Sequence, residues 1–164
     1  MATTLGLTRS EILAFRRHAT ALDERLPHGR RALRHAAWAG LQDSMPRAAL
    51  LSIHARMSGT RPESWEDPSL VQVWGPRFSV YVVAKRDLAL FTLGRLPDES
   101  GPRKRIEEIA ARLQSALAGR RMIQGAAARA MGAKHANELR YAAPTGTLLI
   151  RWDGSHQPDI WNVP

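Results

Sequence analysis

Three polar residues of different chemistry, Gln42, Asp43 and Ser44, follow one another where one helical pattern ends and another begins. An amide, a carboxylate and a hydroxyl can each bind a water molecule or a polar ligand. Residues two apart in an extended turn point the same way, so Gln42 and Ser44 share one side and Asp43 points to the other. These residue types allow a catalytic site at Gln42 and Ser44 and, less directly, at Asp43, but the spacing alone does not assign one.

Helix capping explains the same residues without any chemistry on a substrate. Pro46 is suited to be the first residue of a helix, and an Asp or a Ser just ahead of it is what capping selects. Gln42 would then lie near the end of the preceding helix. From the residues alone, both interpretations of this motif stay open.

Basic side chains gather near the motif and in the last third of the chain. "HGRRALRH", residues 28–35, is dense in arginines that could contact phosphates. In residues 133–143 a Lys, an Asn and an Arg recur at three-residue steps and can reach phosphate, adenine and guanine edges. An ordinary solvated helix face explains this second set equally well. The candidate DNA-binding residues are Arg30, Arg31, Arg34, Arg77, Lys134, Asn137, Arg140, Tyr141, Arg151 and His156.

The charge balance also favours a polyanionic partner. The chain holds 24 Lys and Arg against 15 Asp and Glu, a net charge of +9. Its only lysines are Lys85, Lys104 and Lys134, so nearly all of this charge is guanidinium, which suits planar contacts to phosphate and guanine. Double-stranded DNA is therefore the expected partner. A genome biased towards arginine is the alternative explanation.

Composition excludes several other classes. Without cysteine there is no disulfide and no thiolate metal site. No apolar run approaches the roughly 20 residues of a membrane span, and the charged first stretch cannot serve as a signal peptide. His156 has no second metal ligand at a usable spacing. We expect a soluble cytoplasmic protein without metal, cofactor or membrane contact, and its oligomeric state is not predicted.

The elements that must position these residues are mainly helical. Helices are predicted over residues 8–26, 31–41, from Pro46 onward, 67–74, 87–94, 105–119, 122–132 and 133–143, and strands over residues 77–85, 145–152 and 158–164. Thr8 and Glu11 have the spacing of a capping box, and Ile12 and Phe15 begin the apolar stripe of a helix.

The order of these elements predicts the fold class. Three short helices followed by a hairpin, whose turn is marked by Asp153-Gly154, are typical of a winged helix-turn-helix. A polar stretch with two prolines and a glycine, residues 95–104, divides the chain. We predict a mainly α fold with short β wings, in tandem winged helix-turn-helix units over residues 1–95, which contain the motif, and 103–164.

Four stretches resemble a known family. They are "GLQ-x-x-x-P-x-A-A" at 40–49, "SIHARMSG" at 52–59, "VWGPRFSVYVVAKRDLALFT" at 73–92 and "LLIRWDG" at 148–154. Together they resemble the winged-helix DNA-binding proteins of the AlkZ/YcaQ type, in order and over essentially the whole chain. The resemblance implies tandem winged helices around a basic concave face. The characterised enzymes of that family are DNA glycosylases that remove bulky alkylated bases and unhook interstrand crosslinks. The chain is shorter than these proteins, which implies that a third winged helix is missing.

The resemblance also gives the motif a role. In those enzymes a Gln-x-Gln or Gln-x-Asp motif carries the catalytic groups; Gln42 matches its first position and Ser44 departs from its third. A Gln amide can hold a water and stabilise the oxocarbenium-like sugar, whereas the shorter Ser44 would need a bridging water. The departure favours an alternative, a non-catalytic DNA-binding module such as a regulator or repair accessory. A protein-interaction domain that uses the wings is a third interpretation.

Overall fold

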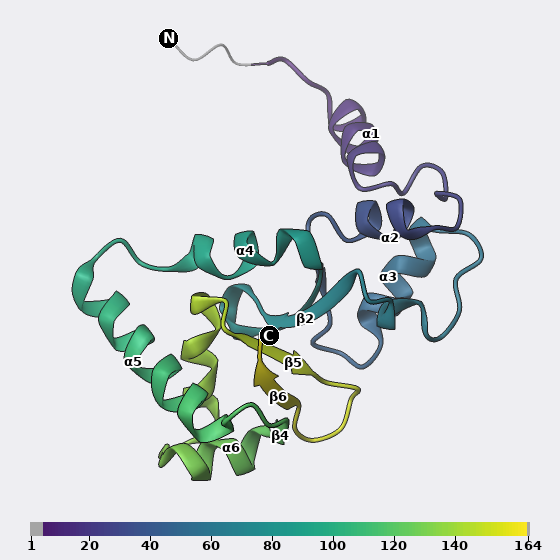
Figure 1. The fold of residues 1–164 in the computed structure, drawn as a ribbon. Helices are drawn as coiled ribbons and strands as arrows, with labels where there is room; N and C mark the ends of the chain where they lie inside the picture. The colour runs from purple at the N-terminus through teal and green to yellow at the C-terminus, as the bar shows by residue number, and fades with distance from the viewer. Residues whose placement is uncertain (1–4, 164) are drawn as a thin grey trace.

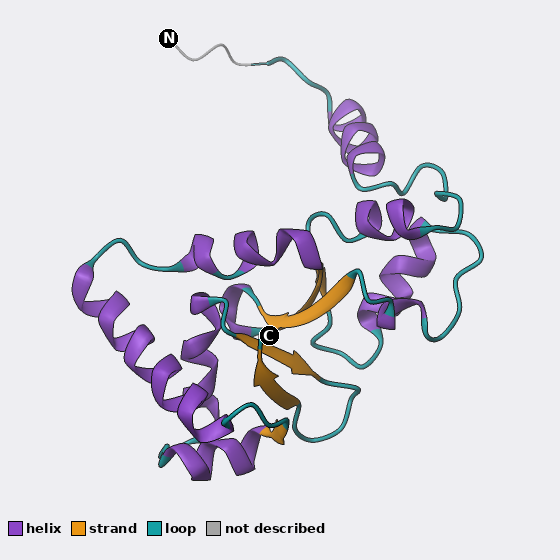
Figure 2. Ribbon diagram, in the orientation of Figure 1, coloured by secondary structure: helices purple, strands orange, loops and turns teal. Residues whose placement is uncertain are grey.

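The computed structural model describes residues 5–163, which form a mainly helical fold around a small antiparallel sheet (Figure 1, Figure 2). The α-helices are α1 (Arg9–Ala19), α2 (Arg30–Ala36), α3 (Ala48–Arg56), α4 (Leu88–Phe91), α5 (Ser100–Leu117) and α6 (Gln124–Met131). The 3₁₀-helices are η1 (Ser64–Glu66), η2 (Pro76–Phe78), η3 (Lys85–Asp87), η4 (Leu93–Arg95) and η5 (Ala136–Thr145). The strands are β1 (Leu41–Gln42), β2 (Leu70–Trp74), β3 (Val80–Ala84), β4 (Met122–Ile123), β5 (Leu148–Arg151) and β6 (Asp159–Asn162). The predicted mainly helical composition with short strands is confirmed; residues 1–4 and 164, included in the predicted units, lie outside the described residues.

One sheet joins the two halves of the chain. Its strand order is β1-β3-β2-β5-β6-β4, and every neighbouring pair is antiparallel. The halves meet where Gln72 of β2 pairs with Ile150 of β5. The predicted dividing stretch contains the connection between η4 and α5, while the sheet runs without interruption from one half to the other.

Two clusters of apolar side chains form most of the core. In the first half Ile53 of α3 and Val82 of β3 are fully buried together. In the second half Leu113 of α5 and Leu139 of η5 are buried in a cluster that also contains Trp74 of β2. Each such side chain contributes about 1.5–3 kcal/mol by leaving water. Trp74 therefore packs the first half against the second.

Helix α1 projects from the body (Figure 1), and none of its residues is buried. The predicted capping box is confirmed, because the Thr8 main-chain N–H donates to Glu11 Oε2 at 2.8 Å and the Glu11 N–H donates to Thr8 Oγ1 at 3.3 Å. The apolar stripe of this helix is exposed: Ile12 is 38% and Phe15 71% exposed. An apolar stripe shows which face of a helix is suited to burial. Few of the described residues pack on that face of α1.

The prediction of a helix over residues 67–74 is wrong. Asp67 accepts a hydrogen bond from the Ser69 main-chain N–H at 2.8 Å, which makes a turn in place of a helix start. Strand β2 then begins at Leu70 and lies inside the sheet, between β3 and β5. Because most of this strand is buried on both faces, it lacks the alternation that reveals a half-exposed strand.

Further boundaries differ from the predictions. The helix expected over residues 8–26 ends at Ala19. The helix expected over residues 31–41 ends at Ala36, and Leu41 belongs to β1. Helix α3 begins at Ala48 and not at Pro46, after Arg47 in the left-handed region (φ 64°). In place of the α-helix expected over residues 133–143, the 3₁₀-helix η5 begins at Ala136. The early end of α2 and the late start of α3 place Gln42 on an edge strand.

Candidate nucleic-acid interface

The motif lies at the end of strand β1, and its side chains alternate between two sides. Gln42 pairs with Tyr81 of β3, and the Asp43 N–H donates to the Val80 carbonyl at 2.8 Å, so the extended backbone continues to Asp43. Gln42 and Ser44 are exposed and Asp43 is buried. The Gln42 Nε2 donates to Ser44 Oγ at 3.1 Å. The two exposed residues therefore form one polar pair on the outer face.

Asp43 points inward and holds the turn. Its side chain is 1% exposed. Oδ1 accepts from the Ala49 N–H at 2.9 Å, in the first turn of α3, and Oδ2 accepts from Gln72 Nε2 at 2.7 Å. Burial raises the pKa of Asp43 above its ordinary value, although these hydrogen bonds oppose the rise. Both carboxylate oxygens accept hydrogen bonds, and the one from the Ala49 N–H is the contact that the capping interpretation expects of Asp43.

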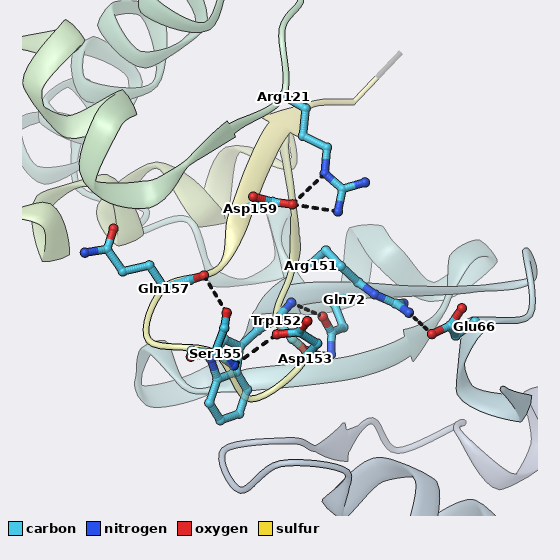
Figure 3. A network of polar contacts seen from close by, with 9 residues as sticks. All are labelled: Glu66, Gln72, Arg121, Arg151, Trp152, Asp153, Ser155, Gln157 and Asp159. Carbon is cyan, nitrogen blue, oxygen red and sulfur yellow. Dashed lines mark hydrogen bonds and ion pairs between the residues drawn. The ribbon is translucent and has the colours of Figure 1, made fainter. Parts of the chain in front are cut away.

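Gln72 links the motif to the second half of the chain. Its Oε1 accepts from the Trp152 N–H at 2.7 Å (Figure 3), and its Nε2 also donates to the Trp152 carbonyl at 3.1 Å. The loop between β5 and β6, residues 152–158, thereby starts beside Asp43. It also packs on Pro46: a Cβ at Gly154 would lie 2.9 Å from Pro46 Cβ. Motif and loop are neighbours in space although they are about a hundred residues apart in sequence.

Hydrogen bonds within the loop give it a defined shape (Figure 3). The Ser155 N–H donates to Asp153 Oδ1 at 3.0 Å, which lowers the pKa of Asp153, and Ser155 Oγ donates to the Gln157 carbonyl at 3.1 Å. Gln157 Oε1 accepts from the Gly125 N–H of α6 at 2.7 Å. His156 is exposed between these residues. The predicted hairpin is confirmed, with a connection longer than a two-residue turn.

Two candidate arginines are engaged by the fold. Arg151 forms an ion pair with Glu66 (Figure 3), and its guanidinium carbon lies 3.7 Å from the centre of the Trp65 ring. Arg140 is half-buried, 5.6 Å from the centre of the Trp74 ring, and burial lowers its pKa. These contacts cross between the halves of the chain.

Three further candidates, on η5 and just before it, line a hollow against α5. Lys134, Asn137 and Tyr141 border this space of about 1220 Å³, together with Arg105 and Arg112 of α5. Two carboxylates, Glu108 and Glu138, line it as well. Tyr141 also packs edge-on against Phe78, with ring centres 5.1 Å apart. The three candidates thus occupy one groove, separate from the motif in sequence.

The first-half candidates lie on short helices. Arg30 and Arg31 on α2 are exposed, and Arg34 is half-buried with its Nε donating to the Arg30 carbonyl at 3.3 Å. Arg77 is exposed in η2 with a positive φ of 57°. No hydrogen bond or ion pair joins these four to the motif.

Sequence reasoning missed Gln72. A polar residue inside the apolar run "LVQVW" is a signal for a buried hydrogen-bonded group once that run is assigned to a strand. Assigning the run to a helix hid that signal.

Across residues 5–163, no helix is both long and apolar enough to cross a bilayer. The same residues contain no group of three His, Asp or Glu side chains arranged to hold a metal ion.

Comparisons with known proteins show a structural likeness and no match in sequence. No protein-family model matches the sequence, and no curated protein matches it. Among solved structures, the DNA glycosylase AlkZ of Streptomyces sahachiroi is similar with a TM-score of 0.67 and 15% sequence identity, over 92% of this chain and 48% of that chain. At this identity the likeness concerns the fold. The chain spans about half the length of AlkZ and is structurally related to it.

Proposed function

We propose that the chain is a DNA-binding protein of the AlkZ/YcaQ type, with winged-helix units over residues 1–95 and 103–164 that share one sheet. The fold likeness to a DNA glycosylase supports this, and so does the net charge of +9. The polar connection between η4 and α5 supports the division into units. Double-stranded DNA is the partner that this charge favours.

The proposed DNA contacts are those candidates that the fold leaves exposed. In the second unit they are Lys134, Asn137 and Tyr141 along the α5–η5 groove, with His156 on the loop. In the first unit they are the exposed Arg30, Arg31 and Arg77, together with the half-buried Arg34. Arg140 and Arg151 instead hold the two halves together, because their guanidinium groups are stacked on tryptophan rings inside the chain.

The activity that we propose is hydrolysis of the glycosidic bond of an alkylated, cationic base. The observation that carries this proposal is the exposed Gln42–Ser44 pair, in a chain with the fold of a glycosylase. Gln42 Nε2 donates a hydrogen bond to Ser44 Oγ, which leaves Gln42 Oε1 free to accept a hydrogen bond and the Ser44 hydroxyl free to donate one. Together they can orient one water.

The step needs little general-acid catalysis, because the cationic base departs as a neutral molecule. The bond from the sugar C1′ to the base nitrogen breaks, and its electron pair neutralises the positive charge of the base. The water oxygen then attacks C1′ and releases a proton to solvent, leaving an abasic site. Gln42 Oε1 would stabilise the positive charge that develops on the sugar. Asp43 acts as a positioning residue, since both of its oxygens are engaged in the fold.

Two assays test the proposal. Binding to random duplex should weaken steeply as salt rises, because phosphate contacts release counterions; a flat salt dependence contradicts DNA binding. Duplex with an N7-alkylated guanine should yield abasic sites, and Gln42→Ala should abolish them. Gln114→Ala, which removes an exposed amide from α5, is the matched control. Product that survives Gln42→Ala removes Gln42 from the mechanism.

The second candidate is a non-catalytic DNA-binding module. It is favoured by the contact in which Ser44 Oγ already binds the amide of Gln42. In that case the native protein binds duplex in a salt-dependent manner and yields no abasic sites. Ser44→Gln then distinguishes a site that lacks its second amide from one without any catalytic role, because only the former gains activity.

A further inference from the structure

A basic hollow of about 690 Å³ lies between α2, the loop that precedes it and η3. Its charged and titratable lining residues are His28, Arg31, Arg34, His35 and Arg86. No Asp or Glu lines it. The α5–η5 groove differs in this respect, because Glu108 and Glu138 line that groove. We call the basic hollow the α2 pocket.

Three segments that are separate in sequence build the α2 pocket. On α2, Arg31, Arg34 and His35 are spaced three and four residues apart and so share one helix face. The preceding loop is fixed to the end of α3: the Leu26 N–H donates to the Arg56 carbonyl at 2.7 Å, and the Ser58 N–H donates to the Leu26 carbonyl at 3.0 Å. Arg86 comes from η3, directly after β3. The fold therefore brings these guanidinium groups to one place.

Few carboxylates oppose the guanidinium groups of the α2 pocket. Within residues 5–163, Asp87 is the one carboxylate in an ion pair with any of the three, at 3.5 Å from Arg86 Nε. Asp67 interacts with Arg34 over a longer range: against the effect of burial, hydrogen bonds from Ser69 and the charges of Arg30 and Arg34 lower the pKa of Asp67. Asp87 does not line the pocket. Arg34 donates to a neutral main-chain carbonyl. Like charges close together repel, and an anion bound between them relieves this repulsion.

We propose that the α2 pocket binds a phosphate group of a polynucleotide. Guanidinium groups present paired donors that match phosphate oxygens, and the three arginines approach the hollow from two sides. This inference extends the proposed DNA binding to a discrete site and adds Arg86, which sequence reasoning did not select. The phosphate can come from the backbone or from a strand terminus.

The experiment uses the full chain and the double variant Arg31→Gln/Arg86→Gln, since both side chains are exposed and their replacement should not disturb folding. Arg17→Gln on α1 is the control, because α1 contributes no lining residue. Titration calorimetry with inorganic pyrophosphate should show affinity that falls at least about tenfold in the double variant, as expected for the loss of charge-assisted hydrogen bonds.

Duplex binding across a salt series gives a second readout. The slope of log affinity against log salt should drop by about 1 in the double variant and by less in Arg17→Gln. A larger effect on duplexes with a 5′-phosphate identifies a terminal phosphate; an equal effect identifies the backbone.

The outcomes separate this inference from the proposed function. Duplex binding with an unchanged slope and unchanged pyrophosphate affinity in the double variant overturns the α2 pocket and leaves DNA binding intact. Equal losses in Arg17→Gln overturn it too, because they indicate general charge. Pyrophosphate binding that the double variant loses, in a protein that binds no duplex, supports phosphate recognition by the pocket and overturns the DNA function. Binding of neither ligand by the native protein overturns both.

Discussion

Replacing Gln72 by Leu tests whether the bridge between the motif and the loop stabilises the fold. Gln72 is 4% exposed and makes three hydrogen bonds, two to Trp152 and one to Asp43. Leu has a similar volume, so the change leaves little cavity. The polar groups left behind decide the result.

The expected loss follows from those groups. Asp43 Oδ2 is a buried acceptor on a carboxylate, and an unpaired group of this kind costs about 2 kcal/mol. The Trp152 N–H and carbonyl are half-buried, and together they add about 1 kcal/mol. Gln72→Leu should therefore lower the free energy of unfolding by about 3 kcal/mol. In a domain of this size that corresponds to a fall in Tm of about 6–12 °C.

Urea denaturation followed by tryptophan fluorescence and by circular dichroism measures this loss. Gln114→Leu, at an exposed position of α5, should change stability by less than about 0.5 kcal/mol. A loss of less than about 1 kcal/mol in Gln72→Leu would refute the reasoning.

A double-mutant cycle with Asp43→Asn locates the cost. In the native background the new amide would place its NH₂ against that of Gln72, so the variant should be destabilised. In the Gln72→Leu background the carboxylate keeps the Ala49 N–H but has lost its partner at Oδ2, so the same change removes a buried charge and should restore part of the stability. The two substitutions should thus be coupled by more than about 1 kcal/mol; additivity would show that Asp43 and Gln72 act independently.

Two further predictions concern stability. Burial raises the pKa of Asp43 above 3.8, so the folded protein binds that proton more tightly than the unfolded chain. The stabilisation from this proton is therefore complete below pH 3.8 and is lost as pH rises through the raised pKa of Asp43. Over that range the urea midpoint of the native protein should fall relative to the midpoint of Asp43→Asn. A native midpoint that rises relative to Asp43→Asn contradicts the raised pKa. Phe15→Ala should change the free energy of unfolding by less than about 0.5 kcal/mol, because Phe15 is 71% exposed. Ile53→Ala in the core should lower that free energy by about 2 kcal/mol or more. Equal losses for the two variants in urea titrations would indicate that α1 packs on the body.

Local patterns predicted much of the fold. The capping box at Thr8, the long helix α5 and the last hairpin each depend on neighbours a few residues apart, which the sequence displays directly. Strand β2 was missed because its neighbours in the sheet, β3 and β5, come from later in the chain and bury both of its faces. Its pattern then resembles a short buried helix.

Long-range pairing also limits what could be predicted of the site. Arg140 and Arg151 have the side-chain type and position expected of DNA contacts. Their partners, Trp74 and Trp65, belong to the other half of the chain, and no pattern near either arginine announces them. Arg86 was missed for the converse reason, since only the fold brings it to α2. Residue type indicated the chemistry, and tertiary contacts decided which residues are available for it.

The two interpretations of the motif, a catalytic site and a helix cap, are compatible. The extended backbone at Gln42-Asp43-Ser44 sends alternate side chains to opposite sides, so Asp43 caps α3 while Gln42 and Ser44 face outward. Capping therefore accounts for Asp43 and leaves the polar pair unexplained by the fold. Because Gln42 is exposed, Gln42→Ala should change stability by less than about 0.5 kcal/mol. Any loss of base excision in that variant then reports on the chemistry of the amide, whereas a loss in Asp43→Asn reports on the position of the turn that carries it.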